Sequence, residues 1–288
     1  MTPDPQPDLP ALDPHAPPLA ILIDYDGTIA LTDVTDAVLE EHVPGAWEGL
    51  DELYILGEVG SRWLMERQAP LLPADPTALL RTAAAQPHDP SFVPFVMRAL
   101  AAGIHVEVVS DGFGFFIGPA MKMLGLPEVP IITARTTFGP SGTTIGWPNG
   151  NPACFVCGTC KRMRVLGHQA AGRSVVFVGD GESDRYAAAH ADRIFAKRRL
   201  VTVCEENGWD YTRWHRFAEL DSWLEGLLDD WRHDPEAIAL PERRPFICGP
   251  EVWGPGHIDP GPEAAGDHLG RLGGGSRRGP IAGAPGDG

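Results

Sequence analysis

The chain has 288 residues, enough for one or two domains with a sizeable core, and its hydrophobic share of 43% is ordinary for a folded protein. The formal net charge of −16 at pH 7 disfavours nucleic acid and anionic membrane surfaces as partners. No apolar run approaches the roughly 20 residues that span a bilayer. The acidic, proline-rich start lacks the basic region and apolar stretch of a secretory signal, so we expect a cytoplasmic protein with no nucleic-acid or membrane partner.

The N-terminal segment, residues 1–18, contains many prolines and no apolar period, which predicts a disordered lead. Residues 19–24 follow as a short apolar run that ends in an acid. Such a run is typical of a strand buried in a parallel sheet.

Residues 33–100 are expected to form a helical cap inserted after this first strand. Apolar residues recur there at steps of three and four, prolines separate the pieces, and no strand pattern interrupts them. The core of the protein is then expected to comprise residues 19–32 and 101–232.

Strands and helices alternate after the cap. The expected strands are residues 105–110, 174–178 and 192–196, with a strand–turn–strand unit at 129–146 that turns at 139–142. The expected helices are residues 161–170, a helix from about residue 182, and residues 220–231. This alternation predicts an α/β fold with a Rossmann-like, doubly wound parallel sheet.

The C-terminal segment, residues 233–288, is dominated by proline and glycine. Such a composition cannot bury enough apolar surface to offset its chain entropy. We therefore expect a disordered tail.

Two carboxylates follow the first strand, in the run Asp24-Tyr-Asp-Gly-Thr28. Asp24 and Asp26 are two residues apart, so they point the same way, and a hard cation such as Mg²⁺ would offset their repulsion. Gly27 allows a sharp turn that could present backbone N–H groups to an anion. The alternative is a simple Asp-Gly turn.

A second acidic turn follows the strand at 174–178. It reads Gly179-Asp-Gly-Glu-Ser-Asp184 and opens a helix, so Asp180 and Asp184 are about one turn apart. Ligands gather at the carboxyl ends of strands in an open α/β sheet, which predicts that this pair lies beside the first. Helix capping is the alternative, although it does not explain two Asp-rich turns on separate strands.

Two weaker signals lie between these turns. Ser110-Asp-Gly112 follows the second strand and could seat a phosphate with a hydroxyl and helix N-terminal amides, or could be a plain helix cap. Lys161 begins a helix, and a lone lysine of this kind is usually a solvated surface charge. The basic run at 197–199 is interpreted as a solvated helix start.

The order of these features resembles the haloacid dehalogenase-like hydrolase superfamily, in its phosphatase branch, over about residues 19–232. The resemblance implies that Asp24 attacks phosphorus to form an aspartyl phosphate. It implies that Asp26 first protonates the leaving oxygen and then deprotonates the attacking water. The dehalogenases of the superfamily lack this second acid, so Asp26 favours phosphoryl transfer.

The resemblance also implies roles for the remaining motif residues. Lys161 would neutralise charge on the nucleophile and the phosphate. Mg²⁺ would be held by Asp24, the Asp26 carbonyl and Asp180, with Asp184 supporting the metal or orienting Lys161. The phosphate would be held by Gly27, Thr28, Ser110, Asp111 and Gly112.

The position of the cap resembles that in phosphoserine phosphatases and their relatives, which implies that the cap selects the substrate. Asp33 and Arg67 stand where those enzymes carry an acid and an arginine that read the amino acid. For Arg67, a surface charge on an amphipathic helix is the alternative.

A further resemblance is to the methionine-salvage phosphatases of the same branch, which act on a methylthiopentenyl phosphate. It rests on Gly146-Trp-Pro148, on the cysteine-rich run Cys154-Phe-Val-Cys157-Gly-Thr-Cys160, and on the stretch from Phe195 to Asn207. The three cysteines are either reduced thiols or zinc ligands, with Cys204 or His168 as a possible fourth ligand.

These features predict a magnesium-dependent phosphatase that acts on a small phosphorylated metabolite. The sequence favours a methionine-salvage type of substrate and leaves phosphoserine phosphatase as the alternative. A hypothesis outside the enzyme class is a non-catalytic phosphate-binding relic of an enzyme. The complete set of charged motif residues argues against this hypothesis. The oligomeric state is not predicted.

Overall fold

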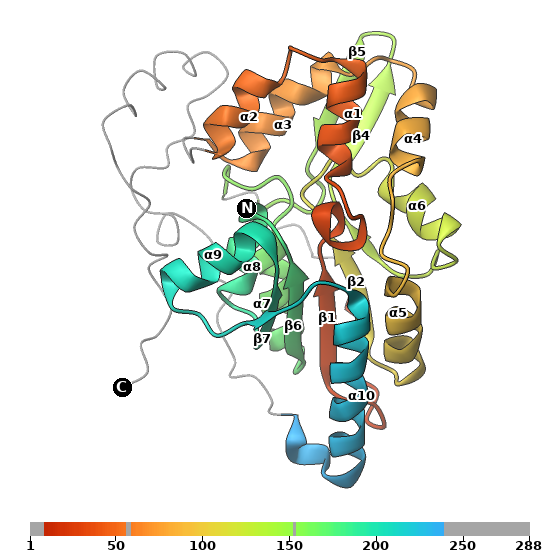
Figure 1. Ribbon diagram of the computed structural model, residues 1–288, viewed down its shortest axis with the longest axis vertical. Helices are drawn as coiled ribbons and strands as arrows, with labels where there is room; N and C mark the ends of the chain where they lie inside the picture. Colours follow the sequence, from red (N-terminus) through yellow and green to blue (C-terminus); the bar gives the residue numbers. More distant parts are fainter. Residues whose placement is uncertain (1–8, 56–58, 152–153, 239–288) are drawn as a thin grey trace.

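The computed structural model describes residues 9–55, 59–151 and 154–238. Its centre is a six-stranded sheet in the order β3-β2-β1-β6-β7-β8, and every pair of neighbouring strands is parallel (Figure 1). The strands are β1 (Leu19–Ile23), β2 (His105–Val109), β3 (Ile131–Ile132), β6 (Ser174–Gly179), β7 (Arg193–Ala196) and β8 (Thr212–Arg213). The predicted α/β fold with a doubly wound parallel sheet is confirmed.

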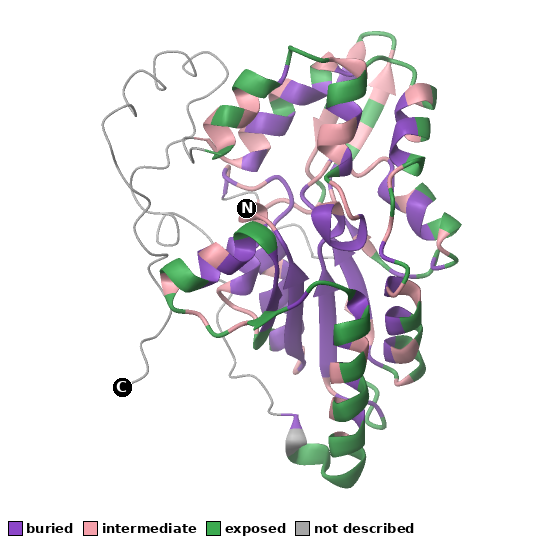
Figure 2. Cartoon of the chain, in the orientation of Figure 1, coloured by how far each residue is buried: buried purple, intermediate pink, exposed green. Residues whose placement is uncertain are grey.

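Both faces of the sheet are buried. The side chains of strand β1 show this, since they alternate between two hydrophobic clusters. Ile21 and Ile23 belong to one cluster, and Ala20 and Leu22 belong to the other, as the two-residue period of a strand requires. The helices α5 (Phe92–Ala101), α6 (Ile117–Met123) and α10 (Phe217–His233) contribute to the first cluster; α7 (Lys161–Ala170), α8 (Arg185–Ala188) and α9 (Arg198–Asn207) contribute to the second. Figure 2 shows the strands buried and the outer helices exposed along their outward faces.

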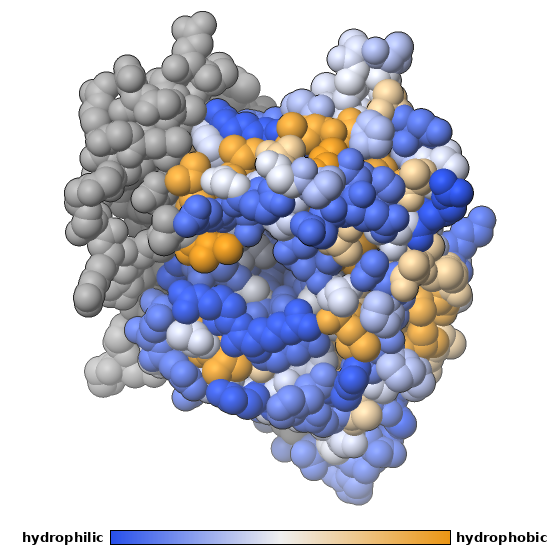
Figure 3. Space-filling view, turned by 45° about the horizontal axis from the view of Figure 1, so that its top comes forward, coloured by the Kyte–Doolittle hydropathy of each residue, from blue (hydrophilic) through white to orange (hydrophobic). Residues whose placement is uncertain are grey.

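The cap lies beyond the carboxyl ends of the central strands (Figure 1). Its helices are α1 (Val34–His42), α2 (Glu48–Ile55), α3 (Ser61–Gln68) and α4 (Thr77–Ala84), with a short helical turn at Ala69–Leu71. Figure 3 shows a hollow between these helices and the core, with hydrophilic side chains along its core side. The cap therefore stands over the end of the sheet where the acidic turns are expected.

The hairpin β4 (Arg135–Gly139) and β5 (Gly142–Gly146) is antiparallel and turns where the sequence predicts. It forms a sheet of its own beside the cap. Thr143 Oγ1 lies 3.2 Å from the carbonyl oxygens of Leu72 and Pro73 and can donate to either. This chain segment, assigned to the core by the sequence, thus contacts the cap.

Helix α5 falls within residues 33–100, which the sequence assigned to the cap, yet it packs on the core. The ring centroids of Phe92 and Phe95 lie 5.0 and 5.4 Å from that of Phe217 in α10. A helical period shows that one face of a segment is buried, but it does not show which layer that face joins.

The ends of the chain are described in part. Residues 9–18 belong to the lead that was predicted to be disordered. In this segment, the carbonyl of Pro10 accepts a hydrogen bond from the side chain of Arg173, and Ala16 is buried. Residues 1–8 and 239–288, which include most of the predicted tail, lie outside the described residues. Among the described helices, none is long and apolar enough to cross a membrane.

Candidate active site

Three neighbouring strands bring the predicted site residues to one edge of the sheet. Strand β1 pairs with β2 on one side and with β6 on the other. Asp24, Ser110 and Asp180 each come directly after one of these strands. The carboxyl ends of adjacent parallel strands meet at one edge, so turns that are far apart in sequence face a common space beneath the cap.

Lys161 lies at the centre of this space. It is the first residue of α7, and its Nζ donates to Asp24 Oδ1 at 2.5 Å, to Asp184 Oδ1 at 2.6 Å and to Ser183 Oγ at 3.2 Å. The side chain is 2% exposed. Burial opposes the charge of Lys161, but Asp184 and Asp24 outweigh burial and raise the pKa of the ammonium group. Lys161 is thus a charged residue of the site and not a solvated surface lysine.

The carboxylates of Asp24, Asp180 and Asp184 converge, with one oxygen of each within 4.8 Å of the others. Burial, followed by the charge of Asp184, raises the pKa of both Asp24 and Asp180, the latter to about 7. Lys161 pairs with Asp24 and Asp184, and Arg198 pairs with Asp180, so the three acids still outnumber their two cations, and a divalent cation would offset the excess. An all-oxygen donor set of this kind fits a hard cation.

Asp184 has little capacity left for a metal ion. Its Oδ1 accepts from Lys161, and its Oδ2 accepts from the backbone amides of Asp180 at 2.9 Å and Gly181 at 3.0 Å. Of the two roles that the sequence allows for Asp184, these contacts suit the orienting of Lys161. The other two carboxylates are held less tightly, because Asp24 accepts from Lys161 on Oδ1 and Asp180 accepts longer bonds, from Thr28 at 3.4 Å and from Arg198 at 3.2 Å.

Asp26 is oriented by the cap. Its Oδ1 accepts a hydrogen bond from the backbone amide of Val34, at the start of α1. Its Oδ2 faces Gly112, where a Cβ atom would lie 2.6 Å from that oxygen. Burial, followed by the charge of Asp33, raises the pKa of Asp26.

The turn predicted at Gly27 is present, with φ of 68°, but its amide is used differently from the prediction. Gly27 N donates to the carbonyl of Thr32 at 2.9 Å, so this N–H group is not presented to an anion. A Cβ at Gly27 would lie 2.1 Å from Asp180 Oδ2, so glycine allows the two turns to approach. Thr28 Oγ1 lies 3.4 Å from Asp180 Oδ1 and donates toward it.

Ser110 and Gly112 form a compact seat, whereas the side chain of Asp111 faces elsewhere. The amide of Gly112 donates to Ser110 Oγ at 3.0 Å, which leaves the hydroxyl hydrogen of Ser110 available to another acceptor. The carboxylate of Asp111 accepts from Ser61 Oγ and from the backbone amide of Thr159. As an acceptor engaged on both oxygens, this side chain does not offer a donor to a phosphate.

The two tentative cap residues have local partners. Asp33 caps helix α1, because its Oδ1 accepts from Asp36 N at 3.0 Å. The guanidinium of Arg67 stacks 3.8 Å above the ring of Trp63 and donates to the carbonyl of Trp63. Asp33 itself is exposed.

The basic run at 197–199 was interpreted as a solvated helix start, and this interpretation is wrong for Lys197, whereas Arg198 and Arg199 are exposed at the start of α9. Lys197 is buried, its Nζ lies 4.0 Å from the ring centroid of Trp214, and burial lowers its pKa to about 8. Arg198 donates to Asp180 Oδ2 at 3.2 Å and to the carbonyl of Leu31 at 2.6 Å. A basic run looks the same in sequence whether its charges meet water or an acidic turn.

The sequence also gave no sign of Thr35. Its Oγ1 is buried and has no hydrogen-bond partner among the described residues. This hydroxyl would lie 3.1 Å from a Cβ at Gly112, next to Asp26 Oδ2 and Ser110 Oγ. A buried unpaired hydroxyl in a polar pocket is a candidate ligand contact.

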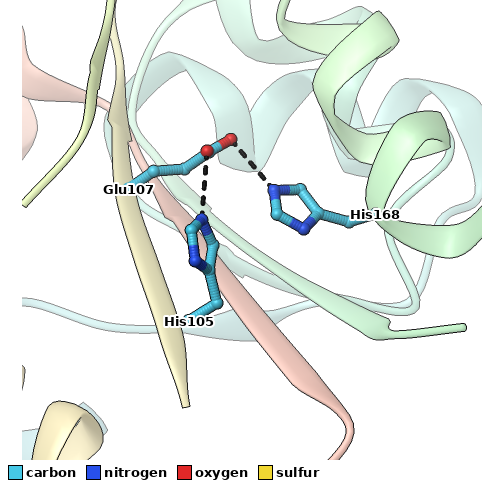
Figure 4. A group of neighbouring side chains, drawn as sticks. All are labelled: His105, Glu107 and His168. Atoms are coloured by element: carbon cyan, nitrogen blue, oxygen red, sulfur yellow. Dashed lines mark hydrogen bonds and ion pairs between the residues drawn. The ribbon is translucent and has the colours of Figure 1, made fainter. Parts of the chain in front are cut away.

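A second group of possible metal-ligating side chains lies between β2, which carries His105 and Glu107, and α7, which carries His168 (Figure 4). His105 Nε2 and His168 Nε2 point toward Glu107, at 3.2 and 3.3 Å from its two oxygens. Arg164 already binds both oxygens of Glu107, through Nε at 2.9 Å and Nη2 at 2.5 Å. A divalent cation here would give a buried site a net charge of about +2, so we assign the group a structural role.

The possible zinc ligands are dispersed. Among the described residues, the two convergent groups of metal-ligating side chains contain no cysteine. His168 belongs to the group around Glu107, and Cys204 is buried in the second hydrophobic cluster.

Comparison with known proteins decides the family. Residues 21–189, more than half of the chain, match the haloacid dehalogenase-like hydrolases. The chain belongs to this family. The matched segment includes Asp24, Asp26, Ser110, Lys161, Asp180 and Asp184.

Similar proteins include 2-hydroxy-3-keto-5-methylthiopentenyl-1-phosphate phosphatases from Bacillus cereus and Bacillus thuringiensis. Each is 27% identical over 218 residues, which span 73% of this chain and 98% of the relative. This haloacid dehalogenase-like hydrolase is an enzyme of the phosphatase kind.

Solved structures of the family share the fold. A phosphoserine phosphatase from T. onnurineus has a TM-score of 0.55 at 19% identity, covering 75% of this chain and 98% of its own. A phosphoserine phosphohydrolase-like protein from Francisella tularensis has a TM-score of 0.54 at 17% identity, covering 72% and 99%.

Proposed function

We propose that this phosphatase hydrolyses a small phosphorylated metabolite through an aspartyl phosphate on Asp24. The observation that carries the proposal is the contact of Lys161 with Asp24 Oδ1, which leaves Oδ2 of the same carboxylate for attack on phosphorus. The bond from Asp24 Oδ2 to phosphorus forms as the bond from phosphorus to the ester oxygen breaks.

Asp26 handles the proton in both half-reactions. Val34 fixes its Oδ1, so Oδ2, which faces Gly112, gives a proton to the leaving oxygen. The same oxygen then takes a proton from the water that attacks the aspartyl phosphate, which returns Asp26 to its starting state.

The remaining residues hold charge and orientation. Lys161 offsets negative charge on Asp24 and on the transferring group, and Asp184 holds Lys161 in place. Ser110 can donate its hydroxyl hydrogen to a phosphoryl oxygen. A Mg²⁺ ion held by Asp24, Asp180 and the Asp26 carbonyl would supply Lewis-acid stabilisation of the phosphoryl charge.

For the substrate, we favour a methylthiopentenyl phosphate of the methionine-salvage type. Support comes from the names of the relatives that are 27% identical to this chain. The matched residues cover 98% of each of these relatives. Phosphoserine is the alternative, and the stacking of Arg67 on Trp63 gives it less support, because that arginine is engaged within its own helix. A cytoplasmic location stays a prediction.

Phosphate release from a panel of monoesters tests the proposal. The panel contains the methylthiopentenyl phosphate, phosphoserine and p-nitrophenyl phosphate, each with Mg²⁺ or with EDTA. We expect release that requires Mg²⁺ and is lost in Asp24→Asn, while the exposed-site control Asp210→Asn retains it. A preference for phosphoserine would show that phosphoserine, and not the methylthiopentenyl phosphate, is the better substrate. Phosphate release that persists in Asp24→Asn would contradict the assignment of Asp24 as the nucleophile.

A further inference from the structure

The start of cap helix α3 docks against the loop that leads to Lys161. The amide of Arg62 donates to the carbonyl of Val156 at 3.2 Å, and Arg62 Nη1 donates to the carbonyl of Cys154 at 3.4 Å. At Gly60, a Cβ atom would lie 2.1 Å from Val156 O. Gly60 has φ of −88°, which any residue can adopt, so close approach is the reason that glycine is needed there.

A buried carboxylate joins this docked helix to the core. Asp111 Oδ2 accepts from the hydroxyl of Ser61, the first residue of α3, and its Oδ1 accepts from the amide of Thr159 at 2.7 Å. All three residues are buried. Because each oxygen has a partner from a different segment, Asp111 ties the cap to the loop that precedes α7.

The same carboxylate is adjacent to two parts of the site. Asp111 follows Ser110 directly, and Thr159 is two residues before Lys161, whose amide donates to the Thr159 carbonyl at 3.1 Å. Movement of α3 away from the core would remove the Ser61 hydroxyl from Asp111 and the Arg62 amide from Val156. The loop at 154–160 would then lose its contacts with α3, while Thr159 would keep Asp111 and the amide of Cys160 would keep the carbonyl of Asn149, at 2.9 Å.

We propose that Gly60, Ser61 and Asp111 are positioning residues that make the placement of Lys161 depend on the docking of the cap. The ammonium group of Lys161 is held in contact with Asp24 Oδ1 when α3 is docked on the core, and its position is less constrained when α3 is undocked. Chemistry is thereby favoured in the closed enzyme, where water is excluded. The kinetic consequence rests on the proposed function, whereas the structural coupling does not.

Two variants and two matched controls test this coupling. Gly60→Ala places a methyl group against Val156 O, and Ser61→Ala removes the donor to Asp111. Gly226→Ala and Ser222→Ala change the same residue types on helix α10, where a Cβ at Gly226 has nothing within 4 Å and Ser222 is exposed. The measurements are hydrogen exchange of the Thr159 amide, the melting temperature, and kcat and KM on the best substrate.

We expect both α3 variants to exchange the Thr159 amide about tenfold faster than the controls and to lower kcat about tenfold, since small displacements of a charged group are costly. Unchanged Thr159 exchange in both variants would overturn the proposal, even if activity fell. Faster exchange with unchanged kcat would overturn the link to Lys161. If the wild-type protein released no phosphate, the proposed function would fail, and the exchange measurement would still decide the coupling.

Discussion

The backbone amide of Val34 donates a hydrogen bond of 2.9 Å to Asp26 Oδ1, so the first turn of the cap orients the side chain that we propose as acid and base. An asparagine at position 26 keeps an oxygen to accept from Val34 but cannot transfer the proton. Asp26→Asn should therefore leave the melting temperature almost unchanged and lower kcat by about 10²–10⁴.

The leaving group provides the control for Asp26→Asn. A p-nitrophenolate ion leaves without a proton, so the loss in kcat should be smaller for p-nitrophenyl phosphate than for an alkyl phosphate. Equal losses on both esters would contradict the role of Asp26 in protonating the leaving oxygen.

Lys161 compensates two buried carboxylates, so its removal should destabilise the protein. In the absence of divalent cations, Lys161→Met should lower the free energy of unfolding by about 3–5 kcal/mol, because Asp24 and Asp184 lose their shared partner. Mg²⁺ should restore part of this loss. Denaturant titrations with and without Mg²⁺ measure both effects, and Lys122→Met, at an exposed lysine of α6, should behave as wild type.

The unpaired hydroxyl of Thr35 should matter to ligands more than to folding. Thr35→Val removes a buried polar atom that lacks a partner, so stability should be unchanged or slightly higher. If the hydroxyl contacts the substrate, kcat/KM should fall about tenfold. Thr144→Val, on the exposed side of β5, is the matched control, and an unchanged kcat/KM in Thr35→Val would rule out the contact.

The pair of Glu107 and Arg164 should contribute strongly to stability, in contrast to an exposed ion pair. Glu107→Gln leaves the buried guanidinium of Arg164 without its charge partner, and we expect a loss of about 3–5 kcal/mol in the free energy of unfolding. Glu225→Gln, in the exposed pair with Arg98, should cost about 0–1 kcal/mol. Metal analysis of the purified protein should find no zinc that depends on Glu107.

His168 should make the stability depend on pH. Burial lowers the pKa of this fully buried imidazole, although Glu107 favours the charged form. The unfolded chain takes up a proton near pH 6.5, so the contribution of His168 is complete above that pH and is lost as the pH falls below it. His168→Leu should flatten the slope of unfolding free energy between about pH 5 and 7, whereas His233→Leu, at an exposed site, should not.

The fold was predictable because hydrophobic periodicity is local. The apolar run before Asp24, the run before Asp180 and the alternation with helices required a parallel sheet, and the sheet has that form. Boundaries between layers were less predictable. Helix α5 has the same period as the cap helices, and its contacts with Phe217 and Asp221 of α10 in the structure place it on the core.

The candidate site was predictable for residues whose position follows from strand order. Asp24 and Asp180 end adjacent strands, so sequence and topology together place them at one edge. The functions of the side chains that flank these acids could not be predicted in this way. Asp111 and Gly27 stand in motifs that suggested phosphate binding. In the structure, the carboxylate of Asp111 joins the cap to the loop that precedes α7, and the amide of Gly27 bonds within its own turn.

The sequence by itself determined the family, the sheet and the residue types of the acidic site, because these depend on local patterns and on the order of motifs. Only the tertiary structure decided which charges meet. Lys161 between Asp24 and Asp184, Arg198 on Asp180, and Glu107 between Arg164 and His168 all join segments that are distant along the chain. Such contacts depend on how helices pack on the sheet, and a local sequence pattern carries no information about that packing.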